Sequence, residues 1–170
     1  MQCAGEKPCL TYSVHPMRSV ADVEQSLADY AGTHCAIEGS LERMGVVLNL
    51  FKKIGSVCFN IDSNSKPLYH VAGVFASNYL VTLYSTAMNC LESSGIDNQT
   101  AKSLIMHLMS GTLENINNAP STEVALTGPI KRGDCDTIKQ HLSALTDVQQ
   151  QALYKVLGLS TLPFSSSSPE

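Results

Sequence analysis

The sequence changes character near residue 62, and this change limits the folds that the chain can adopt. Before it, short apolar runs with the length of buried strands alternate with a helix-like segment. After it, apolar residues recur at helical spacing and no run is typical of a strand. The pattern predicts an α/β part over residues 1–62 and a helical domain over 63–162. A disordered tail is expected over 163–170, because the end SSSSPE has low complexity.

Three strands are predicted in the first part, from the runs CLTYSV, HCAIE and SVCFNI at residues 9–14, 34–38 and 56–61. Between the second and third runs, Ser40 is a candidate N-cap for a helix that would end near Lys53. Strand, helix and strand at this spacing predict a sheet that is covered by helices.

A long helix is predicted from about Ser65 to Ser94, because Pro67 stands in its first turn and Gly95 can end it. Further helices are predicted where a capping residue precedes apolar residues at helical spacing: after Asp97 or Asn98, after Pro120, at about 137–145 and, with Thr146 as its cap, at 147–157. The second part is therefore expected to be all-α.

The composition excludes several classes of protein. A net charge of -4 and the lack of Lys/Arg runs argue against a nucleic-acid groove. Apolar runs stay well short of the roughly 20 residues of a membrane-spanning helix. Without a signal-peptide core at its start, the protein is expected in the cytoplasm. The six cysteines form no C-x-x-C pair or zinc spacing, so we expect free thiols, no structural metal and no disulfide framework.

The most informative stretch is KPLYHVAGVFASNYL, which begins at Lys66. At about 100° per residue, Lys66, His70, Gly73 and Ser77 fall within about 40° of one another, and Asn78 lies beside them. Polar groups aligned on a mostly apolar helix predict the wall of a pocket for a polar small molecule. The alternative is a buried helix whose polar groups are satisfied, or a Lys66 that is merely solvated.

Three groups of residues could carry chemistry. Lys66 stands in the first helical turn, where backbone N–H groups also favour anions, so it could hold a carboxylate or polarise a carbonyl. His15 precedes a proline at the end of a strand, where an imidazole could exchange protons with a ligand or simply occupy a turn. Ser77 and Asn78 could hydrogen-bond a ligand at the same wall or serve helix packing.

The segment TGPIKRGD adds Thr127 and Arg132 as candidate substrate-binding residues. A turn followed by a helix cap at Asp134 accounts for most of this segment. The sequence also has no G-x-G-x-x-G turn, on which dinucleotide folds hold the pyrophosphate. We therefore expect no tight binding of NAD or NADP by this chain.

Several segments resemble one family. KPLYHVAGVFASNYLVTL, GTLENI and ALTGPIKRGD, with SVHPMRSV and CAIEGS before them, resemble Rossmann-like proteins with a C-terminal domain of unknown function 2520. These are described as NADP oxidoreductases similar to deazaflavin-dependent reductases. The resemblance covers most of residues 10–160. It implies the last strands of a Rossmann-type sheet followed by a helical domain of the 6-phosphogluconate dehydrogenase C-terminal type. Family members begin with a further segment that carries the Gly-rich turn, so the chain is expected to be N-terminally truncated.

The resemblance also implies roles for residues. In related hydroxyacid dehydrogenases, 6-phosphogluconate dehydrogenase and ketopantoate reductase, the helical domain supplies a lysine and, one turn later, an amide or similar group. Lys66 and His70 have that spacing, and the His-Pro-Met segment at His15 is similar to one in prephenate dehydrogenases. Lys66 would then polarise the substrate oxygen, His70 or His15 would relay a proton, and Ser77 and Asn78 would position the substrate.

The leading hypothesis is an NAD(P)-dependent oxidoreductase-like protein that acts on a small polar, carboxylate-bearing substrate. NADP or NAD would serve an intact family member. The alternative is a non-catalytic helical module for dimerisation or ligand binding. A homodimer through the helical domain is expected, because the long helix and the helix through Met106, Leu108 and Met109 carry extensive apolar faces. Lys66→Ala is expected to leave folding nearly unchanged, as for a surface lysine.

Overall fold

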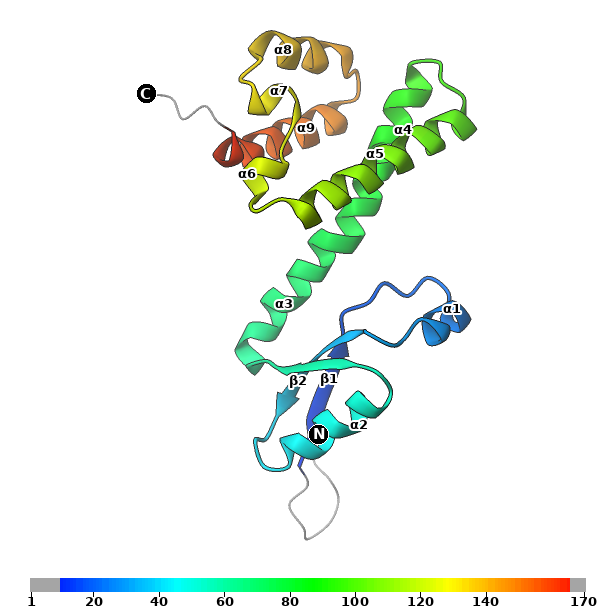
Figure 1. The fold of residues 1–170 in the computed structure, drawn as a ribbon. Coiled ribbons are helices and arrows are strands. Elements are labelled where there is room, and N and C mark those ends of the chain that lie inside the picture. Colours follow the sequence, from blue (N-terminus) through cyan, green and yellow to red (C-terminus); the bar gives the residue numbers. More distant parts are fainter. Residues whose placement is uncertain (1–9, 166–170) are drawn as a thin grey trace. The chain divides into compact units, whose positions relative to one another are not determined.

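The computed structural model describes residues 10–165 (Figure 1). Cys3, Cys9 and the predicted tail from residue 166 onward lie outside the described residues. The chain divides into two compact units, Met1–Val81 and Thr82–Glu170. Each unit is described separately below.

The first unit contains a three-stranded sheet and the helices that cover it. Its elements are β1 (Tyr12–Pro16), α1 (Val23–Ala28), β2 (His34–Gly39), α2 (Met44–Lys53), β3 (Val57–Asn60), the 3-10 turn η1 (Ser63–Ser65) and α3 (Lys66–Gly73). The strand order is β1-β2-β3, with β1 antiparallel and β3 parallel to the central β2. The three strands and the change to helices after them confirm the predicted fold class.

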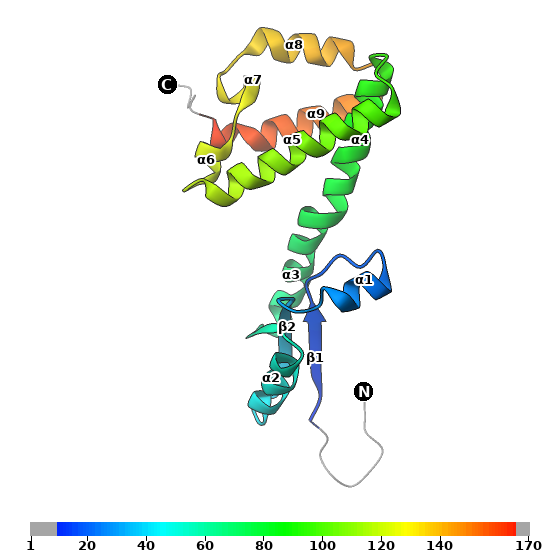
Figure 2. The ribbon, with the colours of Figure 1, turned by 45° about the vertical axis from the view of Figure 1, so that its right-hand side comes forward.

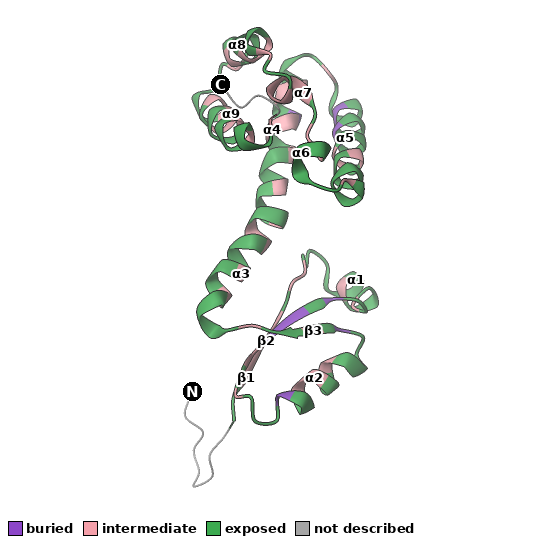
Figure 3. Cartoon of the chain, turned by 60° about the vertical axis from the view of Figure 1, so that its left-hand side comes forward, coloured by how far each residue is buried: buried purple, intermediate pink, exposed green. Residues whose placement is uncertain are grey.

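The central strand β2 carries the core of this unit. Cys35 and Ile37 are fully buried and Ala36 is almost so, as the buried stretch of β2 in Figure 3 shows. Successive side chains of a strand point to opposite faces, so Cys35 and Ile37 share one face while Ala36 and Glu38 share the other. In the register of the ladder, Ser13 pairs with Glu38. The second face is therefore the more polar one.

The helix after β2 begins later than predicted. Ser40 does not cap it: its hydroxyl accepts a hydrogen bond from the Glu42 N–H at 3.2 Å, within the turn itself. The helix starts at Met44, after Arg43 with a left-handed φ of 61°, and has no side-chain cap. Short hydroxyl side chains favour such local turns, which explains why the capping prediction for Ser40 was wrong.

The predicted long helix is present but is not α-helical throughout. After α3 it continues as a π-helical turn, η2 (Val74–Asn78), and then as α4 (Tyr79–Ser93). Gly95, with φ of 85°, ends it as expected. A π turn takes up an extra residue, so residues beyond it are set back by about 100° from a continuous α-helix. The helical phase counted from Lys66 therefore holds only as far as Gly73.

The second unit is helical. It contains most of α4, then α5 (Asn98–Asn118), α6 (Thr122–Ala125), α7 (Gly128–Lys131), α8 (Cys135–Ala144), α9 (Val148–Thr161) and the 3-10 turn η3 (Leu162–Phe164). The helices α4 and α5 form a helical hairpin (Figure 2). Within it, Met88 of α4 packs with Ala101 and Ile105 of α5. In the part of the chain that the structure describes, no helix is long and apolar enough to cross a membrane.

The caps of the second unit agree with the sequence in two of three cases. Asp97 accepts from the Thr100 N–H and Asp134 from the Thr137 N–H, both at 3.1 Å, as predicted. The cap of α9 is Asp147, which accepts from the Gln150 N–H at 2.8 Å. It stands one residue after the predicted Thr146, because the carboxylate is also a strong N-cap and reaches the third helical N–H.

Gly39 should be the residue of β2 that tolerates substitution least. Its φ is 143°, and an added Cβ would lie 2.6 Å from Tyr12 Cδ1 and 2.7 Å from the Thr11 carbonyl oxygen. We predict that Gly39→Ala destabilises the protein by about 1–3 kcal/mol, from backbone strain and overpacking. Gly45→Ala is the matched control, because Gly45 lies in α2 with nothing within 4 Å of an added Cβ. It should be neutral or stabilise by up to about 1 kcal/mol. Urea unfolding of both variants checks the pair, and equal effects would contradict it.

Candidate functional site

The polar face of the sheet meets α3 in a regular series of contacts. Two residues of β1 span about 6.6 Å along the strand, and one turn of α3 spans about 5.4 Å along the helix. Because these spacings are similar, successive side chains of the two elements can face one another over a short distance. The facing groups are Ser13 with Lys66, His15 with Tyr69 and His70, and Met17 with Gly73. An added Cβ on Gly73 would lie 2.7 Å from Met17 Sδ, so this glycine permits the close approach.

Lys66 forms hydrogen bonds with both β1 and β2. Its ammonium donates to Ser13 Oγ of β1 at 2.7 Å and to the Glu38 carboxylate of β2. The Lys66 side chain is 36% exposed and the Glu38 side chain 16%. An ammonium has three N–H donors, so one remains after these two hydrogen bonds. Lys66 is therefore half of an ion pair, and its partner Glu38 was not predicted from the sequence.

Glu38 is held in its ionised form. The Lys66 ammonium, and next the Ser63 hydroxyl, donate to this carboxylate and lower the pKa of Glu38 below its ordinary value. At neutral pH, Lys66 accordingly has a permanent counter-ion. Behind the histidines, burial raises the pKa of the Tyr69 phenol, which keeps its hydroxyl protonated.

Two imidazoles lie next to this ion pair. The ring centroids of His15 and His70 are 5.6 Å apart, and His15 also packs edge-on against Tyr69 at 5.4 Å. Within residues 10–165, Nδ1 of His15 is buried without a hydrogen-bond partner, and so is the Tyr69 hydroxyl. Buried polar atoms are usually hydrogen-bonded. His15 thus keeps hydrogen-bonding capacity that the described chain does not use.

These groups surround a cavity of about 290 Å³ that is lined by His15, Ser63, Lys66, Pro67 and His70. Its volume is close to that of the smaller ligand pockets of proteins. An ammonium, two imidazoles and a hydroxyl around one small space can donate hydrogen bonds to an oxygen and exchange protons with it. The geometry brings together the three residues to which the sequence gave catalytic roles.

The four predicted substrate-binding residues lie elsewhere. Ser77, which is half-buried, and Asn78, which is exposed, belong to the π turn η2 and do not line this cavity. Thr127 and Arg132 flank α7 in the second unit, as its N-cap and C-cap residues. Roles for these four residues in substrate binding stay predictions.

The sequence reasoning missed Glu38, Ser13 and Ser63. The signal for Glu38 was its alternation with Ile37 in the run HCAIE, which places a carboxylate on the face opposite the core. Its pairing with Ser13 depends on the strand register, and that register is not visible in either strand alone.

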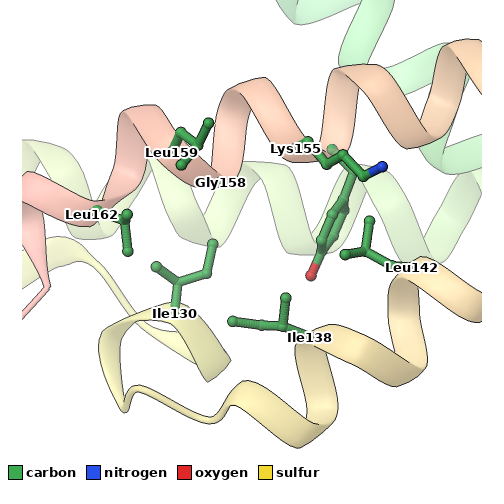
Figure 4. Close-up of a pocket in the computed structure, with 8 residues that line it drawn as sticks. Ile130, Ile138, Leu142, Lys155, Gly158, Leu159 and Leu162 are labelled. Atoms are coloured by element: carbon green, nitrogen blue, oxygen red, sulfur yellow. The ribbon is translucent and has the colours of Figure 1, made fainter.

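A second cavity, of about 330 Å³, lies within the helical unit between α7, α8 and α9 (Figure 4). Ile130, Ile138, Leu142 and Leu159 contribute to its apolar lining. The hydroxyl of Tyr154, at its side, is within hydrogen-bond distance of His141 Nδ1, at 2.9 Å. This hollow is suited to packing or to an apolar partner: Lys155 also lines it, but its lining residues include no histidine.

The strand-to-helix turns differ from the usual site for a dinucleotide. A pyrophosphate needs glycines where backbone N–H groups can approach it closely. The turn after β1 and the turn after β3 contain no glycine, and Gly39, the last residue of β2, packs against Tyr12. The described turns therefore do not fit a dinucleotide pyrophosphate. Over residues 10–165, no group of three or more His, Cys, Asp or Glu side chains is placed to hold a metal ion.

A remnant of a Rossmann-type sheet, followed by a helical domain, defines the class of this protein. The family described as a domain of unknown function, DUF2520, matches residues 33–161, and the chain belongs to this family. No curated protein matches the sequence.

Solved structures show the same fold. Protein TM1727 from Thermotoga maritima is 28% identical with a TM-score of 0.75, and the match covers 91% of this chain and 61% of that protein. BF3122 from Bacteroides fragilis, described as a "putative NADP oxidoreductase", is 24% identical with a TM-score of 0.75, and the match covers 94% of this chain and 60% of that protein. Pyrroline carboxylate reductase of Plasmodium falciparum, with NADP bound, is 8% identical with a TM-score of 0.55, and the match covers 92% of this chain and 62% of that protein. The chain spans about three fifths of these proteins, and it shares their fold over that length.

The ion pair between Lys66 and Glu38 should make the stability of the protein depend on pH in the acidic range. Because the pKa of Glu38 is lowered on folding from 4.5, its contribution is complete above that pH and is lost as the pH falls through the lower folded value. We predict that wild type melts at a higher temperature than Glu38→Gln near neutral pH, and that the difference shrinks below about pH 4.5. Thermal unfolding at a series of pH values measures it. Asp136→Asn, which removes an 86% exposed partner of Lys139, should have a smaller effect. A difference for Glu38→Gln that grows in acid would contradict the assignment.

Proposed function

We propose that this chain supplies the substrate-facing part of an NADP-dependent oxidoreductase that acts on a small polar, carboxylate-bearing molecule. The observation that carries the proposal is the cavity in which Lys66, His15 and His70 converge, with Lys66 paired to Glu38. Membership in the family and the names of two solved neighbours support the reaction class. The size and polarity of the cavity support a small substrate.

The proposed chemistry uses groups that the chain itself provides. The remaining N–H of Lys66 would donate to the substrate oxygen and stabilise the negative charge that develops on it. His15 or His70 would deliver or remove the proton of that oxygen, since imidazole exchanges protons near neutral pH. The assignment is supported by the position of both imidazoles in the lining of the cavity, beside Lys66.

The strand-to-helix turns described above lack the glycine pattern that usually binds the pyrophosphate of a dinucleotide. In this proposal NADP is held outside the described residues, and this chain does not bind it tightly by itself. The residues of the cavity would bind and orient the substrate and would move its proton.

The proposal predicts that small 2-oxo or 2-hydroxy acids bind in the cavity. In an NMR titration of the full chain, at least one such acid should shift the ring signals of His15 and His70. The signals of His107 and His141, which lie in the second unit, serve as internal controls. Lys66→Met should weaken this binding at least about tenfold, because a charge-assisted hydrogen bond is lost.

Lys139→Met is the matched control, because Lys139 pairs with Asp136 on an exposed helix face and should leave binding unchanged. If no acid moves the signals of His15 and His70, the cavity is not the substrate site and the proposed function is wrong.

A second candidate function is a non-catalytic helical module that dimerises. The specific observation is a row of exposed apolar side chains on α5, where Leu104 is 50% and Leu108 70% exposed and one turn separates them. In this reading a second copy of the chain covers the α5 face and forms the homodimer that is expected from the sequence.

Dimerisation predicts a molecular mass twice that of the chain in multi-angle light scattering at micromolar concentration. Leu104→Glu with Leu108→Glu should give a monomer, because two charges would be buried in the interface. Leu50→Glu, at a 61% exposed position of α2 in the first unit, is the control and should leave the mass unchanged. A monomeric wild type would rule this candidate out.

A further inference from the structure

The ion pair of Lys66 with Glu38 points to the kind of group to which the remaining N–H of Lys66 can donate a hydrogen bond. We propose that Glu38 is a specificity-determining residue that makes Lys66 bind a neutral oxygen, a carbonyl or a hydroxyl, and disfavours a carboxylate there. This inference rests on the proposed function and refines it, because it states which part of the substrate faces the lysine.

The first observation is the position of the two charges. Lys66 lines the cavity, whereas Glu38 is not among its lining residues and is only 16% exposed. Glu38 lies on β2, directly across from Ser13 in the ladder, and both accept hydrogen bonds from the same ammonium. A ligand in the cavity therefore meets Lys66 with its counter-ion in contact behind it.

The second observation is the way in which Glu38 is held. Besides Lys66, the Ser63 hydroxyl of η1 donates to its carboxylate and favours its ionised form. His15 on β1 and His70 on α3 share the cavity with Lys66. Asp62 precedes the cavity residue Ser63, and its carboxylate caps η1 by accepting from the Asn64 N–H. Among the described residues, Glu38 is the acid that forms an ion pair with Lys66.

The consequence follows from elementary electrostatics. An incoming carboxylate at Lys66 is attracted by the ammonium but repelled by Glu38 at only slightly greater distance, so much of the attraction is cancelled. A neutral carbonyl or hydroxyl oxygen accepts the remaining N–H without that repulsion. A carboxylate elsewhere on the substrate would lie toward His15 and His70, which line the same cavity.

The competing explanation is that the pair only fastens α3 to the sheet. In that case, removal of the charge on Glu38 would change stability but not the choice of ligand. A test must therefore compare two probes of the same shape that differ in charge. Lactate and lactamide meet this need, since both carry a hydroxyl and only lactate is an anion.

Binding of each probe to the full chain is followed through the ring signals of His15 and His70. The quantity that tests the inference is the ratio of the lactate affinity to the lactamide affinity, compared between wild type and the Glu38 variants. Glu38→Gln should bind lactate at least about tenfold more tightly than wild type does, with lactamide little changed. Asp136→Asn removes an exposed acid of the second unit and should change neither affinity.

Glu38→Asp is the second variant, in case Glu38→Gln does not fold. It keeps the charge but withdraws it from Lys66, so it should raise lactate affinity by a smaller factor. The inference is overturned if the ratio of the two affinities is unchanged in the variants. In that case the probes still bind, and the proposed function stands. If neither probe shifts the two histidines in any protein, the inference and the use of this cavity for substrate fall together.

Discussion

The contact between α3 and β1 is the constraint on which the first unit and its site depend. A strand presents every second residue to a covering helix, and a helix presents roughly one residue per turn to the strand beneath it. The two spacings agree closely enough over three steps to bring Lys66, His70 and Gly73 against Ser13, His15 and Met17. The site lies along this seam because side chains from both elements are in reach of one another only there.

The elements of the fold could be predicted because their signals are local. The apolar runs, the glycine at position 95 and the carboxylates at Asp97 and Asp134 each act within a few residues, and the structure places strands, helix end and caps accordingly. Ser40 was misread because one hydroxyl can serve either a turn or a cap.

The site could be predicted only in part, for two physical reasons. Lys66 and His70 share an α-helical face, so sequence spacing was enough to place them together. Glu38 is a neighbour of Lys66 only through strand pairing, which depends on residues far apart in the chain. Ser77 and Asn78 fall in the π turn, and an extra residue in one turn leaves no trace in hydrophobic periodicity.

The register of β1 also has a consequence for the way in which such a site can vary. Whether a side chain of β1 faces α3 is a matter of parity, since odd-numbered positions such as Ser13 and His15 share one face. Substitutions can alter these residues one at a time and leave the rest in place. An inserted or deleted residue within β1 would exchange the two faces, turning the imidazole toward the core and an apolar neighbour toward the lysine. Changes in length therefore preserve the site only outside β1, while within the strand only substitutions preserve both faces.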